Sequence, residues 1–420
     1  MSVVVPAGTV QPSIPEEPPA GRVTRWLTYL LIGFVGLSLL RVVTGADDLD
    51  STGALRAALV ASVPIALAGL GGLWAERAGV VNIGLAGMMI VGTLGAGYFG
   101  YHYGVVAGLL GAVMFGAIGG VLHALATVIF GVDHIVSGVA INIIAAGVAA
   151  FLAESWFSEL EGGGPTQSPP LPKPPTITID PLVDVFKDLE DKHWFLVSDL
   201  GSFLGVLVDR MSSLTILAFA LVAISGWILW RTPFGLRIRS VGESPTAAES
   251  LGVNVYLYKF VAVTISGALA GLGGAYLAIV SSSGYQNGMT LGLGYIGLAA
   301  MIFGNWRPGG LLLGAGIFGY TRAIDLRGGT DSLHALLLGI GVALVVVAVV
   351  QFRRGRRTQA ILAVVGGAAF TLWYFTTDEV PSQFTGMAPY VTTLLVLALF
   401  SQKLRMPATD GQVYRKGSAG

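Results

Sequence analysis

Runs of about twenty mainly apolar residues recur along this chain, and they restrict its fold more than any other feature. A run of that length crosses the hydrocarbon core of a bilayer as an α-helix, because lipid offers no hydrogen-bond partner for an open backbone. Only 11% of the 420 residues are charged, against roughly a quarter in soluble proteins. The sequence therefore predicts an all-α integral membrane protein, a polytopic helical bundle in the lipid bilayer.

About twelve membrane-spanning helices are predicted. The candidate segments have the approximate bounds 26–43, 54–72, 80–100, 104–130, 135–153, 214–230, 260–280, 289–303, 311–324, 333–350, 361–375 and 389–401. Several contain glycines four residues apart, such as Gly267 with Gly271 and Gly116 with Gly120. This spacing lets transmembrane helices approach closely, so we expect these glycines to pack helices together.

Lysine and arginine residues indicate the orientation, because short cytoplasmic loops collect them. With the N-terminus inside, the inner loops receive the RRGRR run at 353–357 and the basic stretch 231–258. The short outer loops carry Arg41 and Arg56 beside Asp47 and other aspartates. We therefore expect a multi-pass protein of the plasma membrane with both termini in the cytoplasm.

Composition divides the chain into five parts. The proline-rich start lacks the basic and apolar regions of a signal peptide, so the first apolar run should remain as an anchor. In the polar loop after the fifth span, 180–194 could form an amphipathic helix. The expected parts are a disordered cytoplasmic tail 1–25, a first membrane half 26–153, an extracytoplasmic proline-rich loop 154–213, a second membrane half 214–401, and a cytoplasmic tail 402–420.

The longest polar interruption on the inner side, 231–258, contains signals for a very short helix. Ser244 can serve as N-cap, Pro245 suits the first helical position, and Gly252 can end the helix. A helix of less than two turns is unstable alone in water. The exposed face of this short helix is expected to consist of Ala247, Ala248 and Leu251. Such a face suggests that a partner protein holds the helix.

Polar side chains inside apolar segments must face the bundle interior or a wet cavity. Asn82 and Asn142 either join helices or line a translocation pathway, and the sequence leaves both interpretations open. Gln286 and Asn305 are further candidates for the pathway. His123 is expected to be a satisfied interior histidine, and Glu76 with Arg77 to anchor a segment or a partner interface at the membrane boundary.

Enzyme signatures are missing from the sequence. No lysine is followed by Ser or Thr, so a GxxxxGK[ST] phosphate loop is absent. The chain has no cysteine, and its histidines show no spacing typical of a metal site. We predict no catalytic residue, no metal and no cofactor in this chain. Charge is balanced, with 24 basic and 24 acidic residues, which argues against nucleic acid as a partner.

An internal similarity links the two halves. Residues 83–90 read IGLAGMMI and residues 296–303 read IGLAAMIF. The loop charges give the two copies opposite directions across the membrane, as in the inverted repeats of transporters. Chance similarity of low-complexity apolar segments is the alternative interpretation.

Three collinear blocks make a specific resemblance visible. They are LGGLWAERAGVVNIGLAGMMIVG at 70–92, VDHIVSGVAINIIAAGVAAFL at 132–152, and the 232–279 stretch that begins TPFGLRIRSVGESPTAAESLGVN. The chain resembles the permeases of bacterial ABC importers, in the branched-chain amino acid and monosaccharide permease superfamily, and most closely the nucleoside (simple-sugar-like) permeases. The match continues in 292–319, in PYVTTLLVLAL and in DGQVYRKG.

The resemblance implies a transport subunit of an ATP-driven importer, for nucleosides or, as the alternative, a simple sugar. Its partners would be a cytoplasmic ABC ATPase that holds ATP and Mg²⁺, a second permease, commonly a different one, and an extracellular substrate-binding lipoprotein. In the family, the loop at 242–252 is the coupling helix that docks on the ATPase. The residues carried over are Gly242, Glu243, Ser244, Pro245, Ala247, Ala248 and Gly252.

Two departures from the family pattern stand out. Ala86 occupies a position where the family often has glutamate, and the region of about 320–388 adds an apparent helix pair to a core of about ten helices. Two other classes remain as rivals. An ion-coupled secondary transporter would need an ionisable group deep in a span, where this chain offers little beyond His123. An intramembrane enzyme would need a nucleophile, base or metal cluster.

Overall fold

The computed structural model describes residues 19–192, 194–327, 330–381, 386–387 and 404–416. The chain divides into two compact units. The smaller unit comprises Met1–Asp47 with Ala335–Tyr374, and the larger one Asp48–His334 with Phe375–Gly420. The twelfth predicted segment, 389–401, and residues 1–18 of the predicted disordered tail lie outside the described residues. Residues 19–25 of that tail are instead helical, as the start of α1 (Pro19–Thr44).

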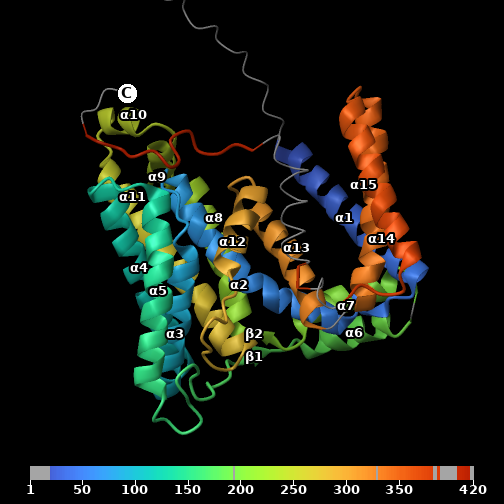
Figure 1. Cartoon of the computed structure of the whole chain (residues 1–420), viewed down its shortest axis with the longest axis horizontal. Helices are drawn as coiled ribbons and strands as arrows, with labels where there is room; N and C mark the ends of the chain where they lie inside the picture. Colours follow the sequence, from blue (N-terminus) through green and yellow to red (C-terminus); the bar gives the residue numbers. More distant parts are fainter. Residues whose placement is uncertain (1–18, 193, 328–329, 382–385, 388–403, 417–420) are drawn as a thin grey trace, which may run out of the picture. The chain divides into compact units, whose positions relative to one another are not determined.

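The larger unit is helical throughout its apolar segments (Figure 1). Its long helices are α2 (Thr52–Arg77), α3 (Leu85–Tyr103), α4 (Val105–Ala124), α5 (His134–Phe157), α8 (Ser213–Arg231), α11 (Val255–Tyr276) and α13 (Pro308–Leu326). Shorter ones are α6 (Asp180–Glu190), α7 (Val197–Val208), α9 (Pro233–Glu243), α10 (Pro245–Ser250) and α12 (Leu293–Phe303). Counted over the described residues of both units, seven helices are long and apolar enough to cross a membrane.

Side-chain caps fix where several of these helices begin. The Ser51 hydroxyl accepts a hydrogen bond from the amide of Ala54 at the start of α2. Asp133 accepts from the amides of Ile135 and Val136 at the start of α5. Each cap satisfies amides that the first helical turn leaves without an internal partner, and so defines the helix boundary.

The helices of the larger unit approach one another through small residues. α3, α4 and α5 lie side by side (Figure 1), and α11 packs against α2, α3 and α4. A Cβ added to Gly267 of α11 would lie 2.8 Å from the Cα of Gly120 in α4. A Cβ added to Gly92 of α3 would lie 2.5 Å from the Cα of Gly271. The predicted packing role of Gly116, Gly120, Gly267 and Gly271 is confirmed.

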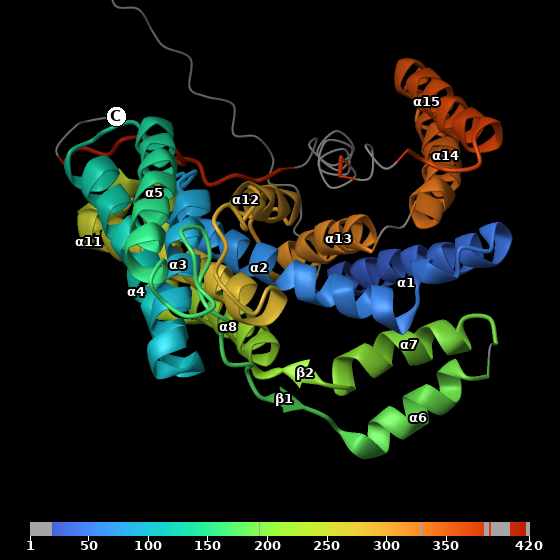
Figure 2. The same cartoon turned by 60° about the horizontal axis from the view of Figure 1, so that its bottom comes forward.

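The proline-rich connection between α5 and α8 is anchored to the bundle. Strands β1 (Thr176–Ile177) and β2 (Met211–Ser212) pair antiparallel, and α6 packs on α7 (Figure 2). The Arg56 guanidinium lies 2.6 Å from the Asp209 carboxylate, and the Thr52 hydroxyl donates to Glu190. This connection therefore lies at the end of the unit where α2 begins. The predicted amphipathic helix at 180–194 is present as α6.

The smaller unit contains α1 (Pro19–Thr44), α14 (Thr330–Arg353) and α15 (Arg357–Thr376), with the first residues of α14 assigned to the larger unit. The RRGRR run forms the turn between α14 and α15, where Gly355 adopts a φ of 77°. A Cβ added to Gly341 would lie 3.2 Å from the Gly367 carbonyl oxygen, so α14 and α15 form a close hairpin. Most of the predicted inserted pair thus groups with α1.

Eleven of the twelve predicted segments coincide with helices. The remaining one, 389–401, lies outside the described residues. α12 has only 11 residues. It rises about 16 Å at 1.5 Å per residue, roughly half of the hydrocarbon thickness. Helix formation at that segment is confirmed, but its length does not suffice for a crossing by itself.

The glycine contacts generate a prediction about stability. Gly267→Val should force α11 away from α4, because backbone atoms rather than flexible side chains occupy the space of the new atoms. We expect a loss of about 1–3 kcal/mol or more, measured as a lower midpoint of thermal unfolding in detergent. The matched control is Gly147→Val in α5, where an added Cβ would meet nothing within 4 Å. Equal losses in both variants would contradict the packing role.

Candidate coupling site at the α10 end of the bundle

The basic stretch between α8 and α11 folds into two helices. α9 starts after Thr232, whose hydroxyl accepts a hydrogen bond from the Gly235 amide at 3.2 Å. It stops at Ser244, where the backbone becomes extended with a φ of −153°. α10 follows, and Gly252, with a φ of 80°, turns the chain toward α11. The predicted short helix is confirmed.

The predicted cap of α10 is only partly right. The Ser244 side chain makes no capping hydrogen bond, although its carbonyl oxygen accepts from the Ala248 amide at 3.0 Å. Pro245 occupies the first helical position as expected and is buried. The extended backbone of Ser244 and the fixed φ of proline therefore start this helix without help from the hydroxyl.

The predicted exposed face of α10 needs a correction. Ala248 is only 2% exposed and packs with Val241 and Val255 in a small apolar cluster. Residues three positions apart share a helix face, so Pro245 and Ala248 both point inward. Ala247 is exposed, and Leu251 at the helix end is 84% exposed. Of the three predicted residues, Ala247 and Leu251 therefore face outward and Ala248 does not.

Gly242, near the end of α9, lies directly against the end of α2. A Cβ at this position would overlap the Arg77 carbonyl oxygen and lie 3.0 Å from the Gly79 amide nitrogen. The Gly242 carbonyl oxygen accepts hydrogen bonds from the amide and the hydroxyl of Thr409, at 3.0 and 2.7 Å. Only glycine permits this approach of three backbone segments.

Glu76 and Arg77, the last residues of α2, hold Trp306 from both sides. The Trp306 indole donates to the Glu76 carboxylate at 2.5 Å. The Arg77 guanidinium donates to the Trp306 carbonyl oxygen at 3.1 and 2.7 Å. Asn305 and Trp306 both have positive φ, 54° and 52°, a conformation that costs energy for residues other than glycine. We call this arrangement the α2 clamp. It secures the turn between α12 and α13, in line with the anchoring role predicted for Glu76 and Arg77.

A segment near the C-terminus crosses this end of the bundle. We call residues 404–416 the strap; Figure 1 shows it in red, passing beside α9 to α10. It has no regular secondary structure. Its amides at Arg405 and Ala408 donate to the Asn305 side chain at 2.7 Å and to the Glu243 carboxylate at 3.3 Å. The strap therefore contacts both the α12–α13 turn and α9.

Charged groups converge where the strap meets α2. Asp410 is 9% exposed and interacts electrostatically with Glu76, Lys259 and Arg77. Burial raises the pKa of Asp410 to about 7, although the positive charge of Lys259 opposes the shift. Lys259 itself is 2% exposed and donates to the Gly79 carbonyl oxygen at 3.3 Å. Glu243 lies 4.0 Å from Arg77. These charges lie at a helix end rather than in the apolar middle of the bundle.

Asn82 and Asn142 make contacts of different kinds. Asn82 is fully buried, and its amide donates to the Ser266 hydroxyl at 2.9 Å. Asn142 accepts from the Gly87 amide at 2.6 Å and donates to the Ile83 carbonyl and to the Tyr295 hydroxyl, at 3.0 and 2.8 Å. Asn142 therefore joins α5 to α3 and α12, whereas Asn82 lies in the connection between α2 and α3 and binds this connection to α11. Tyr295 is 47% exposed, so the Asn142–Tyr295 pair also reaches the surface of the unit.

The other two pathway candidates lie in loops. Gln286 is exposed and its backbone pairs with that of Gln167. Asn305 lies in the turn held by the α2 clamp and accepts the hydrogen bond from Arg405 of the strap. Gln286 and Asn305, like Asn82, thus lie outside the helices of the described structure.

The expectations for His123 and Ala86 can also be judged. Both ring nitrogens of His123 are engaged, with the Ser137 hydroxyl at 2.9 Å and the Val81 carbonyl at 3.0 Å, so it is a satisfied interior histidine. Ala86 is 6% exposed. A Cβ on Gly294 would lie 2.5 Å from the Ala86 Cα. α3 and α12 meet so closely there that a glutamate at 86 would require rearrangement.

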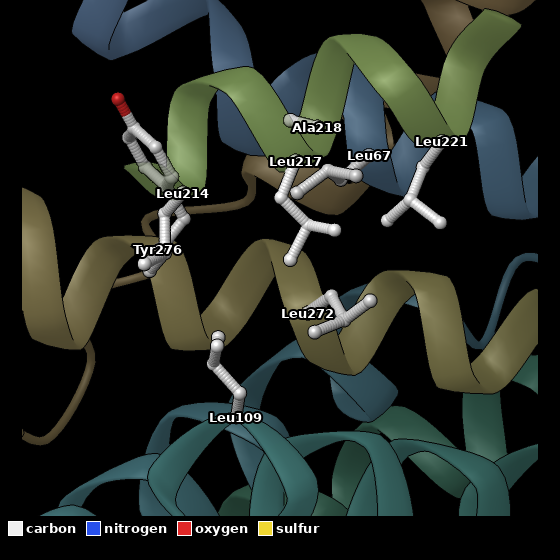
Figure 3. Close-up of a pocket in the computed structure, with 8 residues that line it drawn as sticks. All are labelled: Leu67, Leu109, Leu214, Leu217, Ala218, Leu221, Leu272 and Tyr276. Atoms are coloured by element: carbon white, nitrogen blue, oxygen red, sulfur yellow. The ribbon is translucent and has the colours of Figure 1, made fainter. Parts of the chain in front are cut away.

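An apolar cavity lies between α2, α4, α8 and α11 (Figure 3). It is lined by leucines such as Leu67 and Leu272 together with Tyr276, whose hydroxyl is hydrogen-bonded to Thr215 at 2.8 Å. Its volume is about 10 Å³, which is only enough for one water molecule. This cavity cannot hold an organic solute. In the described part of the chain, no group of three or more His, Asp or Glu side chains is arranged to hold a metal.

Sequence reasoning did not assign roles to Trp306, Thr409, Asp410, Tyr414 and Tyr295. Trp306 and Tyr295 lie within the stretch 292–319 that belongs to the resemblance, and the other three lie in or beside the DGQVYRKG stretch. Spacing along the chain does not show what these residues contact. The available signal was the polar, aromatic character of 409–416 directly after an apolar segment. Such a pattern indicates a surface segment that packs against another part of the protein.

The α2 clamp can be tested with Trp306→Phe. Removal of the indole N–H leaves the buried Glu76 without its donor, which should cost about 1–3 kcal/mol. We expect a lower unfolding midpoint in detergent and increased protease cleavage near the α12–α13 turn. Trp227→Phe in α8, at a position 62% exposed, is the matched control and should change little. A clamp without a role would make the two variants equivalent.

The raised pKa of Asp410 predicts a pH dependence of strap attachment. Between the ordinary value of 3.8 and about 7, the attached strap retains a proton that a detached strap has released. Attachment should therefore weaken as pH rises across this window and change no further above it. Asp410→Asn should remove the dependence and hold the strap more firmly at pH 8. Because the chain lacks cysteine, a spin label on Val413→Cys can report strap mobility at pH 5 and pH 8. Unchanged mobility in the otherwise wild-type protein would refute this.

Permease proteins of ABC transporters are among the known proteins that are similar to this chain. The chain is 34% identical over 372 residues to the nucleoside ABC transporter permease protein NupC of Lactococcus lactis subsp. cremoris. The matched region covers 85% of this chain and 95% of NupC. The chain is 33% identical over 368 residues to the guanosine ABC transporter permease protein NupQ of Bacillus subtilis, with 86% and 96% covered. A second Lactococcus protein, nucleoside ABC transporter permease protein NupB, is 25% identical, with 61% and 67% covered.

A family model supports the same assignment. Residues 54–348 match the model described as branched-chain amino acid transport system / permease component. That range begins in α2 and ends in α14, and so omits α1 and α15. A comparison with solved structures found no match. The chain belongs to the family of branched-chain amino acid transport system permease components.

Proposed function

We propose that this chain is the membrane-spanning subunit of an ATP-driven importer of nucleosides. The observation that carries the proposal is similarity along almost the whole chain to NupC and NupQ, whose names state nucleoside and guanosine transport. Because the chain has no phosphate loop, the ATP and Mg²⁺ belong to a separate ABC ATPase. An extracellular substrate-binding lipoprotein would deliver the nucleoside.

The α10 end of the bundle is our candidate for the ATPase-docking site. α10 is short, packed on Val241 and Val255 from inside, and presents Ala247 and Leu251 outward. Helix α9 before it ends against α2 through Gly242. A push on α10 would therefore reach α2 through backbone contacts. Rigid movement of this kind could switch access from one side of the membrane to the other.

Orientation follows from the same assignment. The α10 end, both termini and the basic loops would face the cytoplasm, in agreement with the distribution of lysine and arginine. The proline-rich connection with α6 and α7 would face outward, toward the binding protein. Two different Lactococcus permease proteins resemble this chain, which supports a second, different permease as the partner in the membrane.

The proposal includes a translocation pathway for the solute and an inverted repeat that relates the two halves of the chain. Among the pathway candidates, Asn142 is favoured, because its Tyr295 partner is 47% exposed and could meet a solute or the second permease. Asn82 is completely enclosed. The similar stretches 83–90 and 296–303 form the start of α3 and most of α12, two helices in contact near Ala86 and Gly294. This neighbouring position supports an inverted repeat and a core of about ten helices with an added pair.

Reconstitution tests the function directly. The complex of this chain with its second permease, ATPase and binding protein is placed in liposomes, and uptake of labelled guanosine is measured with and without ATP, with glucose as competitor. We expect uptake that requires both ATP and the binding protein and that glucose does not reduce. Competition by glucose would favour the simple-sugar importer. Uptake driven by an ion gradient by this chain alone would overturn the proposal.

Docking on α10 predicts the effect of Leu251→Asp. A carboxylate in place of an 84% exposed leucine should disfavour an apolar contact with the ATPase without disturbing the fold. We expect the affinity of the ATPase for the permease to fall on the order of tenfold or more, measured by co-purification and by loss of uptake. The control is Leu182→Asp in α6, a leucine that is 41% exposed at the other end of α2. Equal ATPase recovery from both variants would argue against docking at α10.

A further inference from the structure

The helix α10 has few anchors of its own. It comprises six residues, fewer than a helix needs to persist in water. On one side it follows the extended Ser244, with a φ of −153°, and on the other it ends at Gly252, with a φ of 80°. Gly252 permits backbone rotation, whereas Ser244 is restricted by the proline that follows it. Besides the packing of Ala248 on Val241 and Val255, contacts from elsewhere in the chain can therefore help to fix the orientation of α10.

The strap supplies the first of these contacts at α9. The Thr409 amide and hydroxyl both donate to the Gly242 carbonyl oxygen, at 3.0 and 2.7 Å. The Ala408 amide donates to the Glu243 carboxylate at 3.3 Å. These bonds hold the strap to the last turn of α9, just before the backbone turns into α10.

The second contact lies five residues further along the strap, at α10 itself. The Tyr414 hydroxyl donates a short hydrogen bond to the Glu249 carboxylate of α10. The Tyr414 side chain packs against the cluster of Val241, Ala248 and Val255. Its ring lies 5.4 Å from that of Tyr256 in α11. Tyr414 thus connects α10 with α11.

Between these two points the strap rests on the ends of other helices. Gln412 and Tyr414 enclose a small space with Val128, His134 and Lys259. Val128 lies in the π-helical turn Leu125–Ile129 that follows α4, and the other two lie near the starts of α5 and α11. Asp410 lies beside Glu76 at the end of α2. The strap therefore contacts the same helices that a movement of α10 would have to displace.

We propose that the strap is a positioning element of the coupling site: through Thr409 and Tyr414 it fixes α10 to α9 and α11. The proposal rests on the proposed function in treating α10 as the element on which the ATPase acts. When the ATPase displaces a firmly fixed α10, the helices of the bundle move with it. An α10 released from Tyr414 changes its orientation relative to α11 at Gly252, so ATP is hydrolysed without import.

The main test compares Tyr414→Ala and Tyr414→Phe in the assembled transporter. The measured quantity is guanosine imported per ATP hydrolysed, at equal amounts of complex. We expect Tyr414→Ala to reduce this ratio about tenfold while ATP hydrolysis continues. Tyr414→Phe, which retains the ring, should reduce it about fivefold, the value of one hydrogen bond. The control Tyr103→Phe removes the hydroxyl of an exposed tyrosine at the end of α3 and should have no effect.

A rescue experiment separates positioning from general destabilisation. The chain contains no cysteine, so Glu249→Cys with Tyr414→Cys can be joined by a bismaleimide before assembly. The uncross-linked double variant should show the reduced ratio, and cross-linking should restore most of it. A cross-linked protein that stays uncoupled, or a Tyr414→Ala protein with the wild-type ratio, would overturn the proposal.

A measurement on the permease alone keeps this inference distinct from the proposed function. Spin labels on Ser250→Cys and Leu257→Cys report the distance between α10 and α11 without any ATPase. A narrow distribution is expected with Tyr414 present and a broad one with Tyr414→Ala. If wild-type uptake proves independent of ATP, the proposed function fails, but the distance measurement still decides whether the strap positions α10. Equal widths would refute the strap's role.

Discussion

The contact between the end of α2 and the α12–α13 turn is the interaction on which the rest of this end of the bundle depends. Glu76 and Arg77 bind opposite sides of Trp306, and this holds two consecutive residues at positive φ. The turn in turn presents Asn305 to the strap. α9 and the strap are built onto the same helix end through Gly242, Thr409 and Asp410. Loss of the clamp would therefore disturb all of these attachments.

Close helix packing makes the centre of the larger unit stiff. Where glycine backbones touch, as between α4 and α11, no flexible side chain lies between the two helices to absorb a displacement. The tight contacts lie along α2, α3, α4 and α11. By contrast, α5 exposes much of its apolar surface, including Ile143 and Phe151. The arrangement combines a stiff centre with a periphery suited to lipid or a second permease.

Local patterns predicted most of the helices and the short helix α10, because apolar length, proline and glycine act over a few residues. They could not predict which face of α10 is buried. Ala248 points inward because Val241 and Val255 are there to receive it, and that is a property of the fold. The same holds for Trp306 and Tyr414, whose partners lie 230 and 165 positions away in sequence. Asn82 and Asn142 were recognised as candidates for the translocation pathway. Only the structure shows that the Asn142 side-chain amide donates a hydrogen bond to the hydroxyl of the exposed Tyr295.

The hydrogen bond between Asn142 and Tyr295 has a further chemical consequence. Because the Asn142 amide nitrogen is the donor in this bond, the Tyr295 hydroxyl acts as the acceptor. Its own proton is therefore available to another acceptor atom, and the half-exposed ring offers a flat π surface beside it. Such a surface carries no formal charge. The Tyr295 hydroxyl can donate one hydrogen bond to a carbonyl or ring-nitrogen atom, and its ring can stack on a flat group or lie against a cation.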